Sequence, residues 1–466
     1  MRFQKLFLLT IILLELLGGC ISQDNYNLAI ENVKIFDVHS GKVMEKKTIL
    51  VKDSYIESII DSEEEFMADQ VINGNSRLVT PGFIDTHIHL TDMYGDYENA
   101  PKYLVADSVD YYRNLLTKTY LNYGTTTLAV MGQPENWIES TIKWQNEPSP
   151  NYPNIYITGG AMISDEAREP YIGHTEVKSP EDAKKKVEEY HQLGLQHLKL
   201  YWRLREPEMS AVIDKARELN MYLYGHIDQN VVSIQKALSM GINNFEHLLS
   251  ITLSVFKYDK HYEDLRNKLE IPIKSVDEYL AMRILIFKYL KENPELSKTF
   301  EDLILQLGQQ NATLSTTIHL LGSLAERTYF TTSAEDISEV TIEVLPRYSI
   351  EQKEMLDSAF DIAMEYLKYA HDNGVKIRIG TDCRDGGKAL LSELLLLHEA
   401  GFPMADILQI ATINGAEALY IDDNVGSVVK GKKADLIIFD HDPFQNPEHL
   451  LMKKTIIKDG KVITEI

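Results

Sequence analysis

The stretch Pro81-Gly82-Phe83-Ile84-Asp85-Thr86-His87-Ile88-His89 decides how the rest of the chain is interpreted. It begins as an apolar strand and ends in two histidines that are two positions apart. Side chains two apart in a strand share a face, so His87 and His89 are expected to project together from the strand end. Two imidazoles on one face form a chelating pair for a metal ion, although two unrelated polar residues would give the same pattern.

The sequence that follows alternates short apolar strands with helices. Such alternation predicts βα units and a parallel sheet, and about eight repeats fit an α/β fold of the (β/α)8 TIM-barrel type. The expected strands after the first cover residues 125–130, 154–158, 198–201, 221–225, 242–246, 313–318 and 375–380. We assign residues 81–424 to this barrel.

Four further residues able to bind a metal each end one of the expected strands. Barrel enzymes build their active sites at this C-terminal end of the strands, whereas core packing gives no reason for such residues to gather there. The sequence therefore predicts a metal site made by His87, His89, Lys199, His226, His247 and Asp382.

Both ends of the chain have the pattern of β-structure. Residues 28–60 contain short alternating strands, and Ala434–Asp440 reads as a buried strand near the other end. Asp459-Gly460 between two apolar runs is a strong hairpin signal. We expect residues 27–80 and 425–466 to form one small β-sandwich domain. A charged helical stretch at about 251–310 is expected as an insertion near the barrel mouth, where it shapes a pocket, contacts a second copy in a homo-oligomer, or only packs.

The N-terminus has the features of an export signal. A short basic stretch precedes an apolar run from Leu6 to Leu17, which is shorter than the roughly 20 residues that a membrane span needs. Leu17-Gly18-Gly19-Cys20 resembles the lipobox of bacterial lipoproteins. This resemblance implies a signal peptide at 1–19, lipidation of Cys20, a tether at 20–26, and export to the cell membrane or outer membrane. An ordinary secretory signal with a chance cysteine is the alternative.

The composition excludes some classes of function. The formal net charge of −23 opposes nucleic-acid binding, which needs clustered Lys and Arg. The two cysteines, Cys20 and Cys383, are too few and too distant for an internal disulfide framework.

The motifs together resemble the amidohydrolase superfamily, in its binuclear, carbamylated-lysine branch. The resemblance rests on the run from Gly82 to His89, on Gly-Ala-Glu-Ala-Leu at 415–419, and on the segment 426–436. It implies that His87, His89 and Asp382 hold a buried metal, that His226 and His247 hold an exposed one, and that carbamylated Lys199 bridges both. An unmodified ammonium has no acceptor for a cation. Zinc is the default for such ligands, with manganese or iron as alternatives.

The resemblance also implies a reaction, in which a hydroxide bridging the metals attacks an amide carbonyl and Asp382 transfers the proton. His174, Tyr201 and Arg203 are expected to contact the substrate, although each is also explained by packing or surface charge. Deaminases of the superfamily have His-x-x-Glu where this chain has His226-Ile227-Asp228-Gln229. C–N amide hydrolysis of a dipeptide or N-acyl amino acid is therefore favoured.

Residues 241–247 are similar to prolidase-like and imidazolonepropionase-like members of the superfamily. Hydantoinase-like cyclic amide hydrolysis and lactone hydrolysis remain alternatives. An alternative from another class of function is a surface lipoprotein that binds a ligand without catalysis.

Overall fold

The computed structural model describes residues 25–90, 109–166, 173–227, 231–269, 276–330, 349–383 and 386–463. The expected signal peptide 1–19 and the lipidation site Cys20 lie outside these ranges. The first strand begins at Asn25, so the expected tether 20–26 is too long by its last two residues. Across the described ranges, no helix is both long and apolar enough to cross a membrane.

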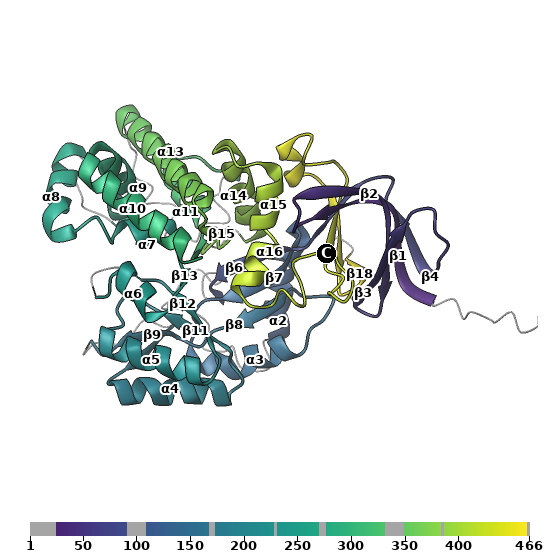
Figure 1. Ribbon diagram of the computed structural model, residues 1–466, viewed down its shortest axis with the longest axis horizontal. Coiled ribbons are helices and arrows are strands. Elements are labelled where there is room, and N and C mark those ends of the chain that lie inside the picture. The colour runs from purple at the N-terminus through teal and green to yellow at the C-terminus, as the bar shows by residue number, and fades with distance from the viewer. Residues whose placement is uncertain are drawn as a thin grey trace, which may run out of the picture.

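Strands from the two ends of the chain form one β-domain, at the right of Figure 1. Its eight-stranded sheet has the order β18-β17-β16-β5-β1-β2-β3, and β4 pairs with β1 in parallel. The strands are β1 (Asn25–Asp37), β2 (Lys42–Lys52), β3 (Tyr55–Asp61), β4 (Met67–Asn73), β5 (Leu78–Pro81), β16 (Leu436–Phe439), β17 (Lys454–Lys458) and β18 (Lys461–Ile463). The domain has an apolar core of its own, to which both ends of the chain contribute. The two-layer sandwich stays a prediction.

The middle of the chain forms an α/β fold with parallel strands. The first sheet contains β6 (Phe83–Ile88), β7 (Thr125–Val130) and β8 (Asn154–Ile157). The second has the order β10-β9-β11-β12-β13-β14-β15. Its members are β9 (Ala161–Ser164), β10 (His174–Val177), β11 (His197–Leu200), β12 (Tyr222–Gly225), β13 (Asn244–Phe245), β14 (Thr313–Ser315) and β15 (Lys376–Arg378).

The two parallel sheets are joined in two places. A parallel bridge joins Thr158, just after β8, to His197 of β11. On the other side, the N–H of Thr86 in β6 donates to the carbonyl of Ile379 after β15, over 2.9 Å. These contacts bring the first and last strands side by side, and complete closure into a (β/α)8 barrel stays a prediction.

Helices cover the parallel strands on the outside (Figure 1). They begin where the sequence provides a start signal: the Ser179 hydroxyl caps α4 by accepting from the N–H of Asp182, and Pro180 follows it. The helices are α2 (Val109–Thr119), α3 (Ile138–Asn146), α4 (Pro180–Gln192), α5 (Glu206–Glu218), α6 (Ile234–Met240), α7 (Leu248–Thr252), α8 (Tyr258–Leu269), α9 (Val276–Glu292), α10 (Pro294–Gln309), α11 (Ile318–Leu324), α13 (Ile350–Asp372), α14 (Gly387–Glu399), α15 (Met404–Ile410) and α16 (Ile413–Ala418).

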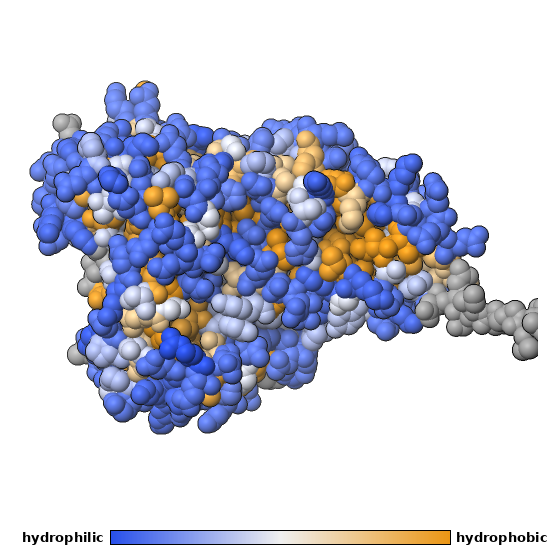
Figure 2. Space-filling model, viewed as in Figure 1, coloured by the Kyte–Doolittle hydropathy of each residue, from blue (hydrophilic) through white to orange (hydrophobic). Residues whose placement is uncertain are grey.

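The helices α7 to α10 occupy the segment between β13 and β14 and lie at the left of Figure 1 with α13. Their outer surface is mostly hydrophilic, whereas hydrophobic residues are visible where β1, β3 and β18 lie (Figure 2). The helix α9 packs against α7, α10, α11 and α13. The insertion is therefore anchored on helices that begin at the ends of β13 and β14.

Two expectations about strands are corrected by the structure. The strand expected at 313–318 ends at Ser315, because Thr317 has a left-handed backbone (φ 56°) and α11 begins at Ile318. The short strands β9 and β10 were not expected, and their four residues each are too few for a periodicity signal. β10 matters for function because it begins with His174.

Candidate metal centre and active site

All six expected metal ligands lie in or after the C-terminal parts of parallel strands. His87 belongs to β6 and His89 follows it, Lys199 belongs to β11, and His226 follows β12 directly. His247 lies two residues beyond β13, and Asp382 lies four residues beyond β15. Because neighbouring parallel strands run in one direction, these ends meet at one rim and bring the six side chains around one cavity.

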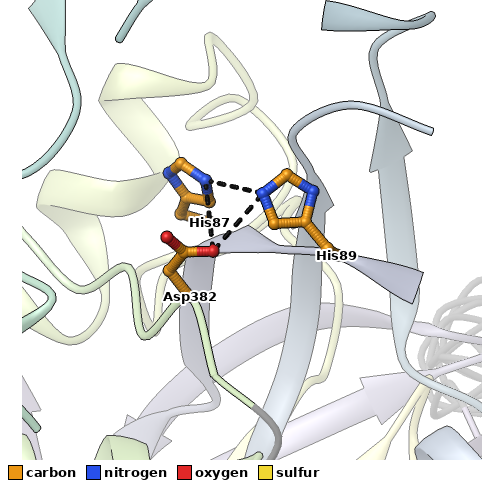
Figure 3. Close-up of side chains that lie close together, drawn as sticks. All are labelled: His87, His89 and Asp382. Carbon is orange, nitrogen blue, oxygen red and sulfur yellow. Dashed lines mark hydrogen bonds and ion pairs between the residues drawn. The ribbon is translucent and has the colours of Figure 1, made fainter. Parts of the chain in front are cut away.

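Three of these side chains form a compact group (Figure 3). His87 Nε2 lies 3.2 Å from His89 Nε2, and His89 Nε2 lies 3.3 Å from Asp382 Oδ1. His87 Nε2 lies 3.7 Å from the same carboxylate oxygen. Ligands that each lie about 2 Å from a zinc ion lie roughly 3 Å from one another, so the three atoms fit a shared cation. The group has the donor chemistry of a divalent metal site.

Asp382 also faces the second pair of histidines. Its other oxygen, Oδ2, lies 3.5 Å from His247 Nε2. The His247 ring centroid is 4.7 Å from that of His226 and 4.6 Å from that of His87. The carboxylate therefore lies between the two groups of histidines and presents one oxygen to each.

Hydrogen bonds to Nδ1 fix the orientation of three imidazoles. The His87 Nδ1–H donates to Glu246 Oε2 over 2.7 Å, and the His89 Nδ1–H donates to the Gly132 carbonyl over 3.2 Å. His247 Nδ1 bonds to the Thr317 hydroxyl over 2.6 Å. Each bond directs Nε2 toward the cavity, which is the arrangement that outer hydrogen bonds give to metal-binding histidines.

The electrostatics of the cavity keep these imidazoles neutral. Burial lowers the pKa of His87, His226 and His247 well below the usual value, and the nearby Lys199 amine lowers each pKa further. A histidine must be neutral to bind a metal, so these imidazoles have the protonation state that a metal ligand would need at neutral pH.

Lys199 has an environment that is unusual for a lysine. Its side chain is 1% exposed, and within the described part of the chain its Nζ has no hydrogen-bond partner. Its Nζ lies 3.9 Å from Glu246 Oε1. Burial lowers the pKa of Lys199 to about 8. Such an amine is partly uncharged near neutral pH and can react with CO₂, which makes this position suited to a carbamate ligand.

The backbone is strained at the same rim. His247 (φ 64°), Thr317 (φ 56°) and Asp382 (φ 48°) adopt positive φ values that residues with a Cβ rarely occupy. Strain of this kind costs about 1–3 kcal/mol per residue and clusters at functional sites. Two of these residues, His247 and Asp382, line the cavity, and the Thr317 hydroxyl bonds to His247.

The cavity has a volume of about 150 Å³ and contains two of the three expected substrate contacts. The His174 ring lies 4.6 Å from the Tyr201 ring, which in turn lies 4.8 Å from the His226 ring. The structure does not place Arg203 in this cavity. Its guanidinium is buried in an ion pair with Glu166 and lies 5.3 Å from the Trp202 ring, so its charge is already compensated.

A buried layer beneath the expected ligands, formed by Glu246 and Arg378, was not predicted from the sequence. Glu246 and Arg378 are both 0% exposed, and Arg378 Nη2 donates to Glu246 Oε1 over 2.9 Å. The available signal was a charged residue inside each apolar strand run, since buried charges are rare unless they are paired. Arg283 of α9 was also missed, and its guanidinium is one of the charges that lower the pKa of His226 and His247 after burial.

Comparison with known proteins identifies the family. A model of the amidohydrolase family matches residues 78–257 and 287–464. The chain belongs to the amidohydrolase family. Members of this family similar to the chain include hydrolases and deaminases, and two curated relatives illustrate the range.

An imidazolonepropionase from Brevibacillus brevis is 35% identical over 99 residues, which cover only 20% of this chain and 23% of that protein. A 5-methylthioadenosine/S-adenosylhomocysteine deaminase from Thermoanaerobacter pseudethanolicus is 22% identical over 94% of each chain. Among solved structures, a prolidase in complex with N-methylphosphonate-L-proline superimposes with a TM-score of 0.66 at 16% identity, covering 94% of this chain and 99% of that one. At such low identity this last likeness shows the fold.

Proposed function

We propose that this amidohydrolase hydrolyses the C–N amide bond of a dipeptide or N-acyl amino acid, using two divalent metals on a closed (β/α)8 barrel. The observation that carries the proposal is the buried Lys199 amine, which has no hydrogen bond within the described residues and lies in the cavity with Asp382 and the four histidines expected as metal ligands. As a carbamate, formed when the neutral amine adds to CO₂ and releases a proton to solvent, Lys199 would bridge two metals.

The proposed ligands divide into two sets. His87, His89 and Asp382 would hold one metal, and His226 and His247 the other. Bound metals, with zinc as the default, would supply a water that is deprotonated near neutral pH and a Lewis acid for the scissile carbonyl.

The chain's own residues would bind the substrate and move the proton. Asp382 presents one oxygen to each group of histidines, and this supports a role in which it would accept a proton from the attacking water and deliver it to the leaving amine. His174 and Tyr201 line the same cavity beside His226, where they can contact the amide. The cavity volume of about 150 Å³ favours a compact group at the reacting end of the substrate.

A positive charge that acts on two of the expected metal ligands supports a substrate that has a carboxylate. Arg283 lies in α9 between the buried residues Met282 and Ile284, and α9 packs against α7, which begins directly after His247. The guanidinium acts electrostatically on His226 and His247. Arginine binds carboxylates through paired charged hydrogen bonds, and both dipeptides and N-acyl amino acids end in a carboxylate.

Deamination is the second candidate, because the deaminase from T. pseudethanolicus matches 94% of the chain. A test measures amino acid release from a library of dipeptides and N-acyl amino acids, and ammonia release from 6-aminopurine nucleosides, by the same metal-loaded protein. The proposal predicts amino acid release that a chelator abolishes. Ammonia release without amide hydrolysis would overturn it in favour of deamination.

We propose further that the protein is exported and anchored to a bacterial membrane through lipidated Cys20. The support is the basic, apolar and Leu-Gly-Gly-Cys order of the first 20 residues. Metabolic labelling with a palmitate analogue tests this proposal, and unchanged labelling of a Cys20→Ser variant would overturn it.

A further inference from the structure

Glu246 is a buried carboxylate beneath the cavity that neither metal binding nor proton transfer uses. It lies between β13 and His247 and is 0% exposed. Its Oε2 accepts from the His87 Nδ1–H at 2.7 Å and from the Ser315 hydroxyl at 2.6 Å. Its Oε1 accepts from Arg378 Nη2 at 2.9 Å and lies 3.9 Å from Lys199 Nζ.

The two oxygens of Glu246 therefore face two different expected ligands. Oε2 requires a proton on His87 Nδ1, which leaves the Nε2 lone pair toward His89 and Asp382. Oε1 faces the Lys199 side chain from below. One rigid carboxylate thus contacts a ligand expected for the buried metal and the residue expected to bridge both metals.

Arg378 makes this arrangement compatible with two charge states of Lys199. The guanidinium is 0% exposed and also donates to the Phe245 carbonyl, so it is fixed beneath the site. It compensates the charge of Glu246 whether Lys199 is an ammonium ion or an anionic carbamate. A single buried carboxylate without this partner would favour the ammonium alone.

We propose that Glu246 is a positioning residue that prepares both metal positions, by fixing the Nδ1–H tautomer of His87 and by aligning the Lys199 side chain. This inference rests on the proposed two-metal site, although it does not depend on the identity of the substrate. Loss of outer hydrogen bonds to metal-binding histidines typically costs 10–100-fold in metal affinity.

Glu246→Gln is the sharpest substitution, because it preserves size and replaces one oxygen with an NH₂ donor. If the NH₂ faces Arg378, two donors oppose each other. If it faces His87, it requires an acceptor at Nδ1 and moves the imidazole proton to Nε2, where it blocks the metal. Either orientation is predicted to weaken metal binding by 10–100-fold.

Thr313→Val is the matched control. The Thr313 hydroxyl contacts Arg378 Nε at 3.3 Å and donates to Asn244, so the variant also loses buried hydrogen bonds beside Arg378. It leaves the contacts of Glu246 with His87, Ser315 and Arg378 in place and is predicted to bind metal like the wild type.

The experiment measures zinc affinity by competition with a chelator, together with the absorption spectrum of the cobalt-loaded protein and the thermal midpoint of each variant. Folded Glu246→Gln protein with wild-type affinity for both metals would overturn the proposal. If the Gln variant does not fold, Glu246→Asp keeps the charge opposite Arg378 but withdraws the carboxylate from His87. Unchanged affinity in that variant would also overturn it. Wild-type protein that binds fewer than two metals contradicts the proposed function instead, which separates the two failures.

Discussion

Replacing Lys199 with methionine should have opposite effects on the metal-free and the metal-loaded protein. Burial lowers the pKa of Lys199 from 10.5 to about 8. At 1.36 kcal/mol per unit, keeping the ammonium buried costs the folded state on the order of 3 kcal/mol. A lysine with a depressed pKa destabilises the folded state fully below pH 8, and this destabilisation disappears as the pH rises through 10.5.

Methionine has a similar length and no charge, so the metal-free variant should be more stable than the wild type at pH 7 by up to about 3 kcal/mol. Glu246 keeps its contacts with Arg378 and His87 in the variant. These contacts limit the stability that is lost when the Lys199 charge no longer faces Glu246. For a chain of this size the unfolding entropy is on the order of 1 kcal/mol per kelvin, so the thermal midpoint should rise by roughly 3 °C.

The assay is differential scanning calorimetry of both proteins, first with chelator and then with Zn²⁺ and bicarbonate. Metal at 100 times its dissociation constant stabilises a folded protein by about 2.7 kcal/mol per site, so the wild type should gain stability on loading. The variant should not gain the contribution of a bridged pair of metals. A metal-free variant less stable than the wild type, or an equal gain on loading, would refute this reasoning.

Three further predictions concern single side chains. Asp382→Asn should lower kcat on a dipeptide by about 10²–10⁴-fold, because the proton acceptor is lost; wild-type turnover in the folded variant would contradict this role. Arg283→Met should raise KM for a free dipeptide by roughly 10–100-fold, the loss of one charged hydrogen bond, with little change for the dipeptide amide; equal effects on both substrates would exclude carboxylate binding by Arg283. Burial raises the pKa of Glu393 from 4.5 to about 8, so its contribution to stability is present below pH 4.5 and is lost as the pH rises through 8. Glu393→Gln should therefore flatten the fall in thermal midpoint between pH 5 and 9, and a slope identical to that of the wild type would show that Glu393 is not its source.

The gathering of the six expected ligands at one rim was predictable, because it depends on strand periodicity and strand polarity. His87 and His89 share a face at the end of one strand, and every other expected ligand lies in or after another parallel strand. These rules operate over a few residues and survive errors of two or three residues in strand ends. The expected strand 242–246 has only two residues in the structure, yet His247 still reaches the cavity.

The layer beneath the ligands was not predictable, because it depends on which side chains meet across distant strands. Glu246 and Arg378 are separated by 132 positions and come together only when β13, β14 and β15 are adjacent. The ion pair of Arg203 was unpredictable for a related reason. Its partner, Glu166, comes from the segment after β9, a strand with no clear sequence signal. Local patterns predict the strand end at which a residue lies. Tertiary contacts determine which distant residue compensates its charge.

The most direct test is the metal and carbamate content of the wild-type protein, measured by elemental analysis and by ¹³C NMR after loading with Zn²⁺ and ¹³C-bicarbonate. The proposed site predicts two metals per chain and a carbamate resonance that is absent from Lys199→Met. One metal per chain with no carbamate resonance, in protein that is fully active, would contradict the central claim that Lys199 bridges a pair of metals.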